Sequence, residues 1–173
     1  PATLTISKAP LIATAANASR PYGTSNPAFI INYSGFVNSE TSTVLDTAPI
    51  ASTTAIMASP VGNYPIHVKP GLDNNYSITP VNGTLSIVKA NPIITWTNPT
   101  AIIYGTPLSG TQLNASANVP GAFVYTPANG TVLNAGSGQT LTANFNPTDA
   151  TNYNPVIGAS VSITVNKAIP VIT

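Results

Sequence analysis

The sequence contains no cysteine and few charges, and each shortage excludes a class of function. Without cysteine there is no disulfide or thiol chemistry, and the only histidine, His67, cannot supply the three or four ligands of a zinc site. Charged residues make up 5% of the chain, against about 25% in ordinary soluble domains. The net charge of +1 leaves too few cations for a nucleic-acid-binding face. The few carboxylates also argue against a calcium cage.

The chain also lacks long apolar runs and long helix-forming stretches. No run approaches the roughly 20 residues of a membrane span, so no membrane span is expected. The 17 prolines exclude long helices, while 43% hydrophobic residues are too many for a disordered chain. Thr, Asn and Ser supply most of the polarity. A cysteine-free, charge-poor composition of this kind is typical of secreted bacterial repeats, and we expect an extracellular or cell-surface location.

Three short motifs recur at nearly one period, which indicates a tandem array. Lys-Ala occurs at 8, 89 and 167, Tyr-Gly-Thr at 22 and 104, and Asn-Tyr at 75 and 152. The motifs predict two units, residues 9–89 and 90–167. Residues 1–8 then read as the terminal strand of a preceding repeat or as a donor strand. Residues 168–173 read as the start of a following repeat.

Alternating apolar and polar residues predict an all-β chain of two β-sandwich or β-grasp-like modules. The clearest apolar stripes fall in five segments: Phe29 to Tyr33, Tyr64 to Val68, Leu85 to Ile87, Leu141 to Phe145, and Val161 to Val165. Asn82-Gly83 predicts a hairpin turn, with Asn129-Gly130 as its counterpart. Residues 39–45 are the one helix candidate, capped by Asn38 or Ser39. The short junction Val88 to Pro92 has little slack and predicts a rod.

Two groups of residues carry a family resemblance. The segment from Ala16 to Phe29, containing Arg20-Pro21-Tyr22-Gly23-Thr24, resembles MBG repeats of the YGX type, and later segments around Tyr64 and Asn82 continue the match. The second unit resembles bacterial Ig-like repeats, through Ala101 to Leu108, Gln112 to Ala115 and Asn146 to Asp149. The resemblance implies an all-β unit from a large bacterial surface or secreted protein, usually a stalk or adhesin module. It implies no catalytic residues.

The residues with chemical potential are better explained by structural roles. We expect His67 to face solvent from a strand, and Asp46, Asp73 and Asp149 to hold turns. Tyr22 and Tyr104 recur in both units, which favours packing at a strand end over ligand recognition. The only tryptophan, Trp96, is expected to pack in a core or between units. We therefore predict a protein that is not an enzyme and needs no cofactor.

The leading hypothesis is a structural segment of an extracellular filament or surface stalk, with identical chains or neighbouring repeats as head-to-tail partners. The segment Thr3, Leu4, Thr5, Ile6 and Ser7 could donate a strand to the next molecule, or the chain could be a window on a giant polypeptide. The alternative is an adhesin module that binds a surface glycan or a host protein. Its best candidate contacts are Trp96, Tyr104 and Tyr125.

Overall fold

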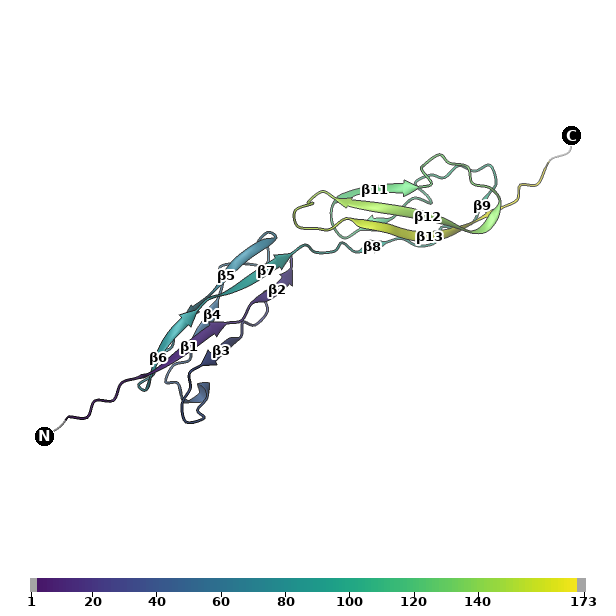
Figure 1. Ribbon diagram of the computed structural model, residues 1–173. Helices are drawn as coiled ribbons and strands as arrows, with labels where there is room; N and C mark the ends of the chain where they lie inside the picture. The colour runs from purple at the N-terminus through teal and green to yellow at the C-terminus, as the bar shows by residue number, and fades with distance from the viewer. Residues whose placement is uncertain (1–2, 171–173) are drawn as a thin grey trace. The chain divides into compact units, whose positions relative to one another are not determined.

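The computed structural model describes residues 3–170, and the chain divides into two compact units. The first ends at Lys89 and the second begins at Ala90. Each unit has two β-sheets and a hydrophobic core of its own (Figure 1). No α-helix occurs within residues 3–170, so the all-β prediction is confirmed, and the multiple sheets are consistent with a β-sandwich.

The first unit contains a three-stranded and a four-stranded sheet. In the three-stranded sheet, β1 (Ala9–Ala15) lies between β3 (Ile31–Ser34) and β6 (Tyr76–Val81). The four-stranded sheet has the order β2 (Ala18–Pro21), β7 (Gly83–Val88), β5 (Gly62–Lys69) and β4 (Ile50–Ser52). The first strands pair in parallel with the last, β1 with β6 and β2 with β7.

The predicted hairpin at Asn82-Gly83 is wrong. The strands on either side of Asn82, β6 and β7, belong to different sheets, so the chain crosses from one sheet to the other at this point. The Asn82 side chain accepts a hydrogen bond from the Val68 N–H at 3.0 Å. A β-carbon on Gly83 would lie 2.6 Å from the carbonyl oxygen of Ala15. The glycine is therefore required by a close approach between two backbones, and a turn with positive φ is not involved.

The predicted helix at residues 39–45 shrinks to one 3-10 turn, η1 (Ser42–Val44), preceded by Thr41. Asn38 and Ser39 cannot cap it as expected, because both have left-handed backbone with φ of 54° and 61°. They form the centre of a tight turn, closed by the Glu40 N–H donating to the Val37 carbonyl at 3.0 Å. A turn of this kind interrupts the helical backbone before it can begin.

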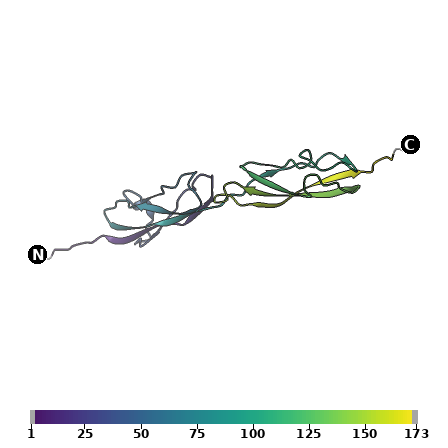
Figure 2. The same ribbon diagram turned by 90° about the horizontal axis from the view of Figure 1, so that it is seen from above.

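The second unit also contains two sheets. A small one pairs β8 (Ile94–Thr95) with β10 (Ser116–Ala117). The larger has the order β11 (Gly121–Thr126), β12 (Gly136–Pro147), β13 (Val156–Asn166) and β9 (Ile102–Ile103). Its long strands β12 and β13 run side by side (Figures 1 and 2). Asn129-Gly130 forms a turn within the loop between β11 and β12, closed by Thr131 N–H on Ala128.

The four-stranded sheets of the two units have the same strand order and the same strand directions. In the first unit β2 is parallel to β7, β7 is antiparallel to β5, and β5 is antiparallel to β4. In the second unit β9, β13, β12 and β11 repeat these relations in turn. One sheet frame is thus built twice from sequences that share only short motifs.

The predicted apolar stripes on the long strands face the two cores. Buried side chains of the first core include Ile66, Val68, Leu85 and Ile87. The second core includes Leu141, Ile163 and Val165. Phe29 is partly buried against the first core but precedes β3. The alternation therefore identified the inward faces correctly, because one face of each strand must leave water.

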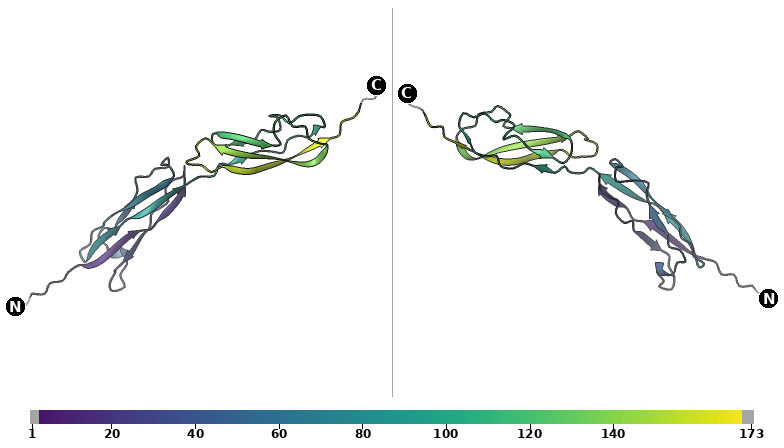
Figure 3. Two further views of the ribbon diagram at one scale, coloured as in Figure 1. Left: turned by 45° about the horizontal axis from the view of Figure 1, so that its top comes forward. Right: turned by 180° about the vertical axis from the view of Figure 1, so that it is seen from behind.

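The N-terminal segment is the exception to this pattern. Residues 3–8 have no strand assignment, and the segment extends away from the strands of the first unit (Figure 3). Leu4 and Ile6 are 85% and 86% exposed. Residues 1–2 of the expected terminal strand and residues 171–173 of the expected following repeat lie outside the described residues. Within the described part of the chain, no helix has the length and apolarity to cross a membrane.

Candidate functional site

The sequence motifs of the repeat meet at the ends of each unit. The Tyr22 N–H donates to the Val88 carbonyl at 2.8 Å, and the Tyr104 N–H donates to the Asn166 carbonyl at 2.8 Å. At the opposite end, Ala9 N–H donates to Asn75 at 2.8 Å and Ala90 N–H donates to Asn152 at 2.9 Å. The motifs recur because the same two backbone closures recur.

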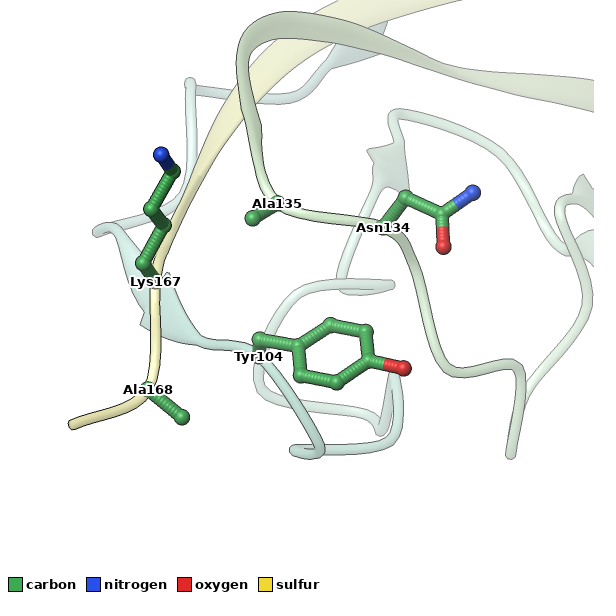
Figure 4. Close-up of a pocket in the computed structure, with 5 residues that line it drawn as sticks. All are labelled: Tyr104, Asn134, Ala135, Lys167 and Ala168. Atoms are coloured by element: carbon green, nitrogen blue, oxygen red, sulfur yellow. The ribbon is translucent and has the colours of Figure 1, made fainter. Parts of the chain in front are cut away.

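At the end of the second unit these contacts border a shallow cavity, wide open to solvent, with a volume of about 330 Å³ (Figure 4). Five residues from three separate segments of the chain line it: Tyr104, Asn134, Ala135, Lys167 and Ala168. The parallel pairing of β9 with β13 places Ile103 opposite Asn166, so the residues that follow, Tyr104 and Lys167, stand next to each other. A tyrosine, an asparagine and a lysine from separate segments thereby line one opening.

The two recurring tyrosines differ in their surroundings. Tyr22 is partly buried and packs against the first core, as predicted for both of them. Tyr104 is 50% exposed and lines the cavity. The expectation that Tyr104 packs on a core is therefore not met. A position that repeats for structural reasons in one unit carries an accessible ring in the other.

Trp96 and Tyr125 lie together and pack against the second core. Their rings make an edge-to-face contact with centroids 5.4 Å apart, and the Trp96 indole N–H donates to the Gln112 carbonyl at 3.1 Å. Burial raises the pKa of the Tyr125 hydroxyl. Neither residue lines the cavity beside Tyr104. The three aromatic residues named from the sequence therefore form a partly buried pair against the second core and a separate exposed ring.

His67 and the aspartates occupy the structural positions that the sequence predicts. His67 is exposed on β5. The Asp149 carboxylate accepts from the Asn152 N–H at 3.1 Å and from its side-chain amide at 2.7 Å. Asp46 accepts from Asn74 N–H at 3.1 Å. Within residues 3–170 no group of three His, Cys, Asp or Glu side chains gathers to hold a metal ion.

The Asp73 carboxylate accepts hydrogen bonds from three backbone N–H groups. It accepts from Asn75 N–H at 2.7 Å, from Tyr76 N–H at 2.9 Å and from Asp46 N–H at 3.3 Å. The bond from Asn75 is the main cause that lowers the pKa of Asp73, followed by those from Tyr76 and Asp46 and by the charge of Lys8, against an opposing effect of burial. The ionised form of Asp73 therefore ties together the loops around residues 46 and 74.

We expect the stability of the first unit to fall in acid because of Asp73. A lowered folded-state pKa means that its contribution is complete above the ordinary aspartate value of about 4 and is lost as pH falls below it. The Asp73→Asn variant should unfold more easily at pH 7 and lose less stability between neutral pH and about pH 3. Thermal melts at several pH values test this. Parallel curves for the variant and the wild type would contradict it, and Trp96 fluorescence follows the second unit as an internal control.

Arg20 in β2 is only 4% exposed and has a structural role that its sequence pattern does not predict. Its guanidinium donates to Asn26 Oδ1 at 2.6 Å, to the Ile56 carbonyl at 2.6 Å and to the Pro21 carbonyl at 3.2 Å. The Asn26 amide in turn donates to the Ala55 carbonyl at 2.7 Å. One sequence feature could have indicated these hydrogen bonds: Arg20 and Asn26 flank Tyr22-Gly23-Thr24. The single arginine of a charge-poor chain is expected to have a specific partner nearby.

One known family matches the first unit. Residues 11–86 match the MBG domain (YGX type), so this segment is similar to that family over nearly the whole sandwich of the first unit. MBG domains are structural, non-catalytic modules typical of secreted surface proteins. No curated protein matches the chain.

Proposed function

We propose that this chain is a non-catalytic structural segment of a bacterial extracellular filament or surface stalk. Three observations support the proposal. Residues 11–86 match a module family of secreted surface proteins. Each unit has its own core. Charged residues make up 5% of the chain. The hydration of a surface rich in hydroxyl and amide groups therefore changes little with salt or pH.

The observation that carries the proposal is the parallel pairing of the first and last strands in the first unit. Six residue pairs join β1 to β6, and four join β2 to β7. Force applied through the two ends of the unit pulls parallel neighbours in opposite directions along their length. All hydrogen bonds of the ladder then resist together, whereas an antiparallel hairpin pulled at its open end breaks them one at a time. This arrangement suits a module that transmits tension.

The second unit has a shorter parallel ladder. Within residues 3–170, two residue pairs join β9 to β13, and an isolated bridge joins Ala90 to Tyr153. Since fewer bonds share the load, we expect the second unit to unfold at a lower force than the first. Stretching single molecules of the intact chain should give two unfolding events of different force. Truncation or a destabilising substitution in the first unit should remove the stronger event.

The pulling direction provides a sharper test, because the chain has no cysteine and accepts unique thiol handles. Handles at Ser7→Cys and Val88→Cys pull the parallel ladder along its length. Handles at Ile50→Cys and Lys69→Cys, which are register partners at one end of the antiparallel β4–β5 pair, unzip that pair. The first geometry should resist a clearly larger force. Equal forces in the two geometries would remove the main support for the stalk.

We further propose that the second unit is a divergent copy of the first, and a bacterial Ig-like repeat. The shared strand order and the two recurring closures support this relation. They also define the junction. The Val88 carbonyl is bonded within the first unit and Ala90 N–H within the second, so Lys89 alone separates them along the sequence. A junction this short favours transmission of force from one unit to the other.

Head-to-tail assembly remains a proposal of the same kind. The exposed Leu4 and Ile6 support it, since a segment with alternating apolar side chains is suited to strand addition. The partner would be a second copy of this chain or a neighbouring repeat. Sedimentation at rising concentration should show assembly in the wild type and none after Leu4→Asp with Ile6→Asp. A wild type that stays monomeric would exclude strand addition but leave the stalk role intact.

A further inference from the structure

The cavity beside Tyr104 has the composition of a ligand site rather than of a packing defect. Its lining combines one aromatic ring, one amide and one of the five cationic side chains of the chain. Ala135 and Ala168 add small apolar patches. In Figure 4 the Tyr104 ring lies below Ala135, with Asn134 to one side and Lys167 to the other, and the Lys167 side chain extends away from the ring. An exposed tyrosine offers an apolar face and a polar hydroxyl at the same time.

The walls of this cavity are held by the fold. Tyr104 is fixed by its N–H bond to Asn166 at 2.8 Å and by the turn that Thr106 N–H closes on the Ile103 carbonyl at 3.0 Å. The loop that carries Asn134 and Ala135 is fixed by Gln139, whose amide donates to the Asn134 carbonyl at 2.6 Å. Because these residues are already held in place, less conformational entropy is lost when a ligand binds.

We propose that this cavity binds a carboxylate-bearing sugar, such as a uronic acid or a sialic acid. The C–H face of a pyranose ring is apolar and flat enough to lie on Tyr104. Its hydroxyl groups match the donors and acceptors of the Asn134 amide. The carboxylate matches the Lys167 ammonium, which has no competing acidic residue among the lining side chains. A volume of about 330 Å³ is enough for one sugar ring and part of a second.

The site goes beyond the stalk role and is specific to the second unit. The corresponding Tyr22 is partly buried against the first core, so the same motif offers no free ring there. Two further cavities lack this combination. One, beside Pro120 and Tyr153, has no cationic residue in its lining. The other, beside Ile6, has no aromatic residue, and its Lys8 ammonium already donates to the Asp73 carbonyl at 2.7 Å.

Titration of the intact chain followed by amide NMR tests the proposal. Galacturonic acid and sialic acid should shift the amide signals of Gly105, Ala135 and Ala168, with a dissociation constant of about 1 mM. Galactose should bind at least tenfold more weakly, because it lacks the carboxylate. The relative affinity of the two acids identifies the sugar type.

Variants separate recognition of a sugar from attraction of an anion. Tyr104→Ala should weaken binding at least tenfold, while Tyr104→Phe keeps the ring and should bind nearly as well as the wild type. Lys167→Met should abolish the preference for acidic over neutral sugars, and the exposed Lys69→Met in the first unit should change nothing.

Three results would overturn the proposal. The first is the absence of shifts at about 50 mM sugar, well above the expected dissociation constant. The second is an equal response to acetate, which would show attraction of an adventitious anion only. The third is unchanged binding by Tyr104→Ala.

Discussion

Replacing Arg20 with alanine is expected to destabilise the first unit by about 2 to 4 kcal/mol. The substitution removes three hydrogen bonds, to Asn26 Oδ1 and to the carbonyls of Pro21 and Ile56. These oxygens lie in partly buried surroundings where water replaces the lost donors poorly. For a unit of this size, the melting temperature should fall by about 10 °C or more.

Two further variants show which part of Arg20 matters. Arg20→Met keeps most of the aliphatic chain and should lose nearly as much stability as Arg20→Ala, because the hydrogen bonds are the larger contribution. The exposed Lys69→Ala should change stability by less than about 0.5 kcal/mol. Calorimetry follows both units, and Trp96 fluorescence isolates the second, which should melt unchanged. A melting temperature for Arg20→Ala equal to that of Lys69→Ala would show that the guanidinium network contributes little.

Replacing Gly83 with alanine is expected to destabilise the first unit by about 1 to 3 kcal/mol. The added β-carbon would meet the Ala15 carbonyl oxygen at 2.6 Å and the Ala16 carbonyl oxygen at 3.0 Å. Both contacts are to backbone atoms, which cannot rotate aside as a side chain would. The two crossing strands would have to separate, and β1, β2, β6 and β7 would lose part of their parallel ladders.

Gly110→Ala is the matched control for this substitution. A β-carbon at Gly110 meets nothing within 4 Å, and the backbone there is not left-handed. Alanine at this position should leave both melting transitions within about 0.5 kcal/mol of the wild type. If Gly83→Ala is equally harmless, the crossing of the two strands is looser than the close approach of their backbones indicates.

The sequence predicted which residues of a strand face the core. Leu85 and Ile87, and likewise Ile163 and Val165, alternate with polar residues because one face of each strand packs on a core. The turn roles of Asp73 and Asp149 followed from the chemistry of aspartate beside backbone amides. Such features depend on neighbours close in sequence, so the sequence alone identifies them.

Contacts between distant segments decided the features that the sequence did not predict. Asn82-Gly83 has the composition of a hairpin turn, but the backbone of Ala15 determines its role. The partners of Arg20 include Ile56, far along the chain. The exposure of Tyr104 depends on where β13 leaves the sheet, which no local pattern encodes. Local sequence patterns do not show which strands pair when those strands lie far apart in the sequence.

At one equivalent position of their four-stranded sheets, the first unit has a hydrogen-bonding residue and the second unit an apolar one. Arg20 stands opposite Ile87 in its sheet, and Ile102 stands opposite Val165 in the equivalent position. Asn26 and Leu108 follow the two tyrosines at the same spacing. The attraction between apolar groups weakens on cooling. We therefore expect the apolar contact of Ile102 and Leu108 in the second unit to lose more strength on cooling than the hydrogen bonds of Arg20 in the first.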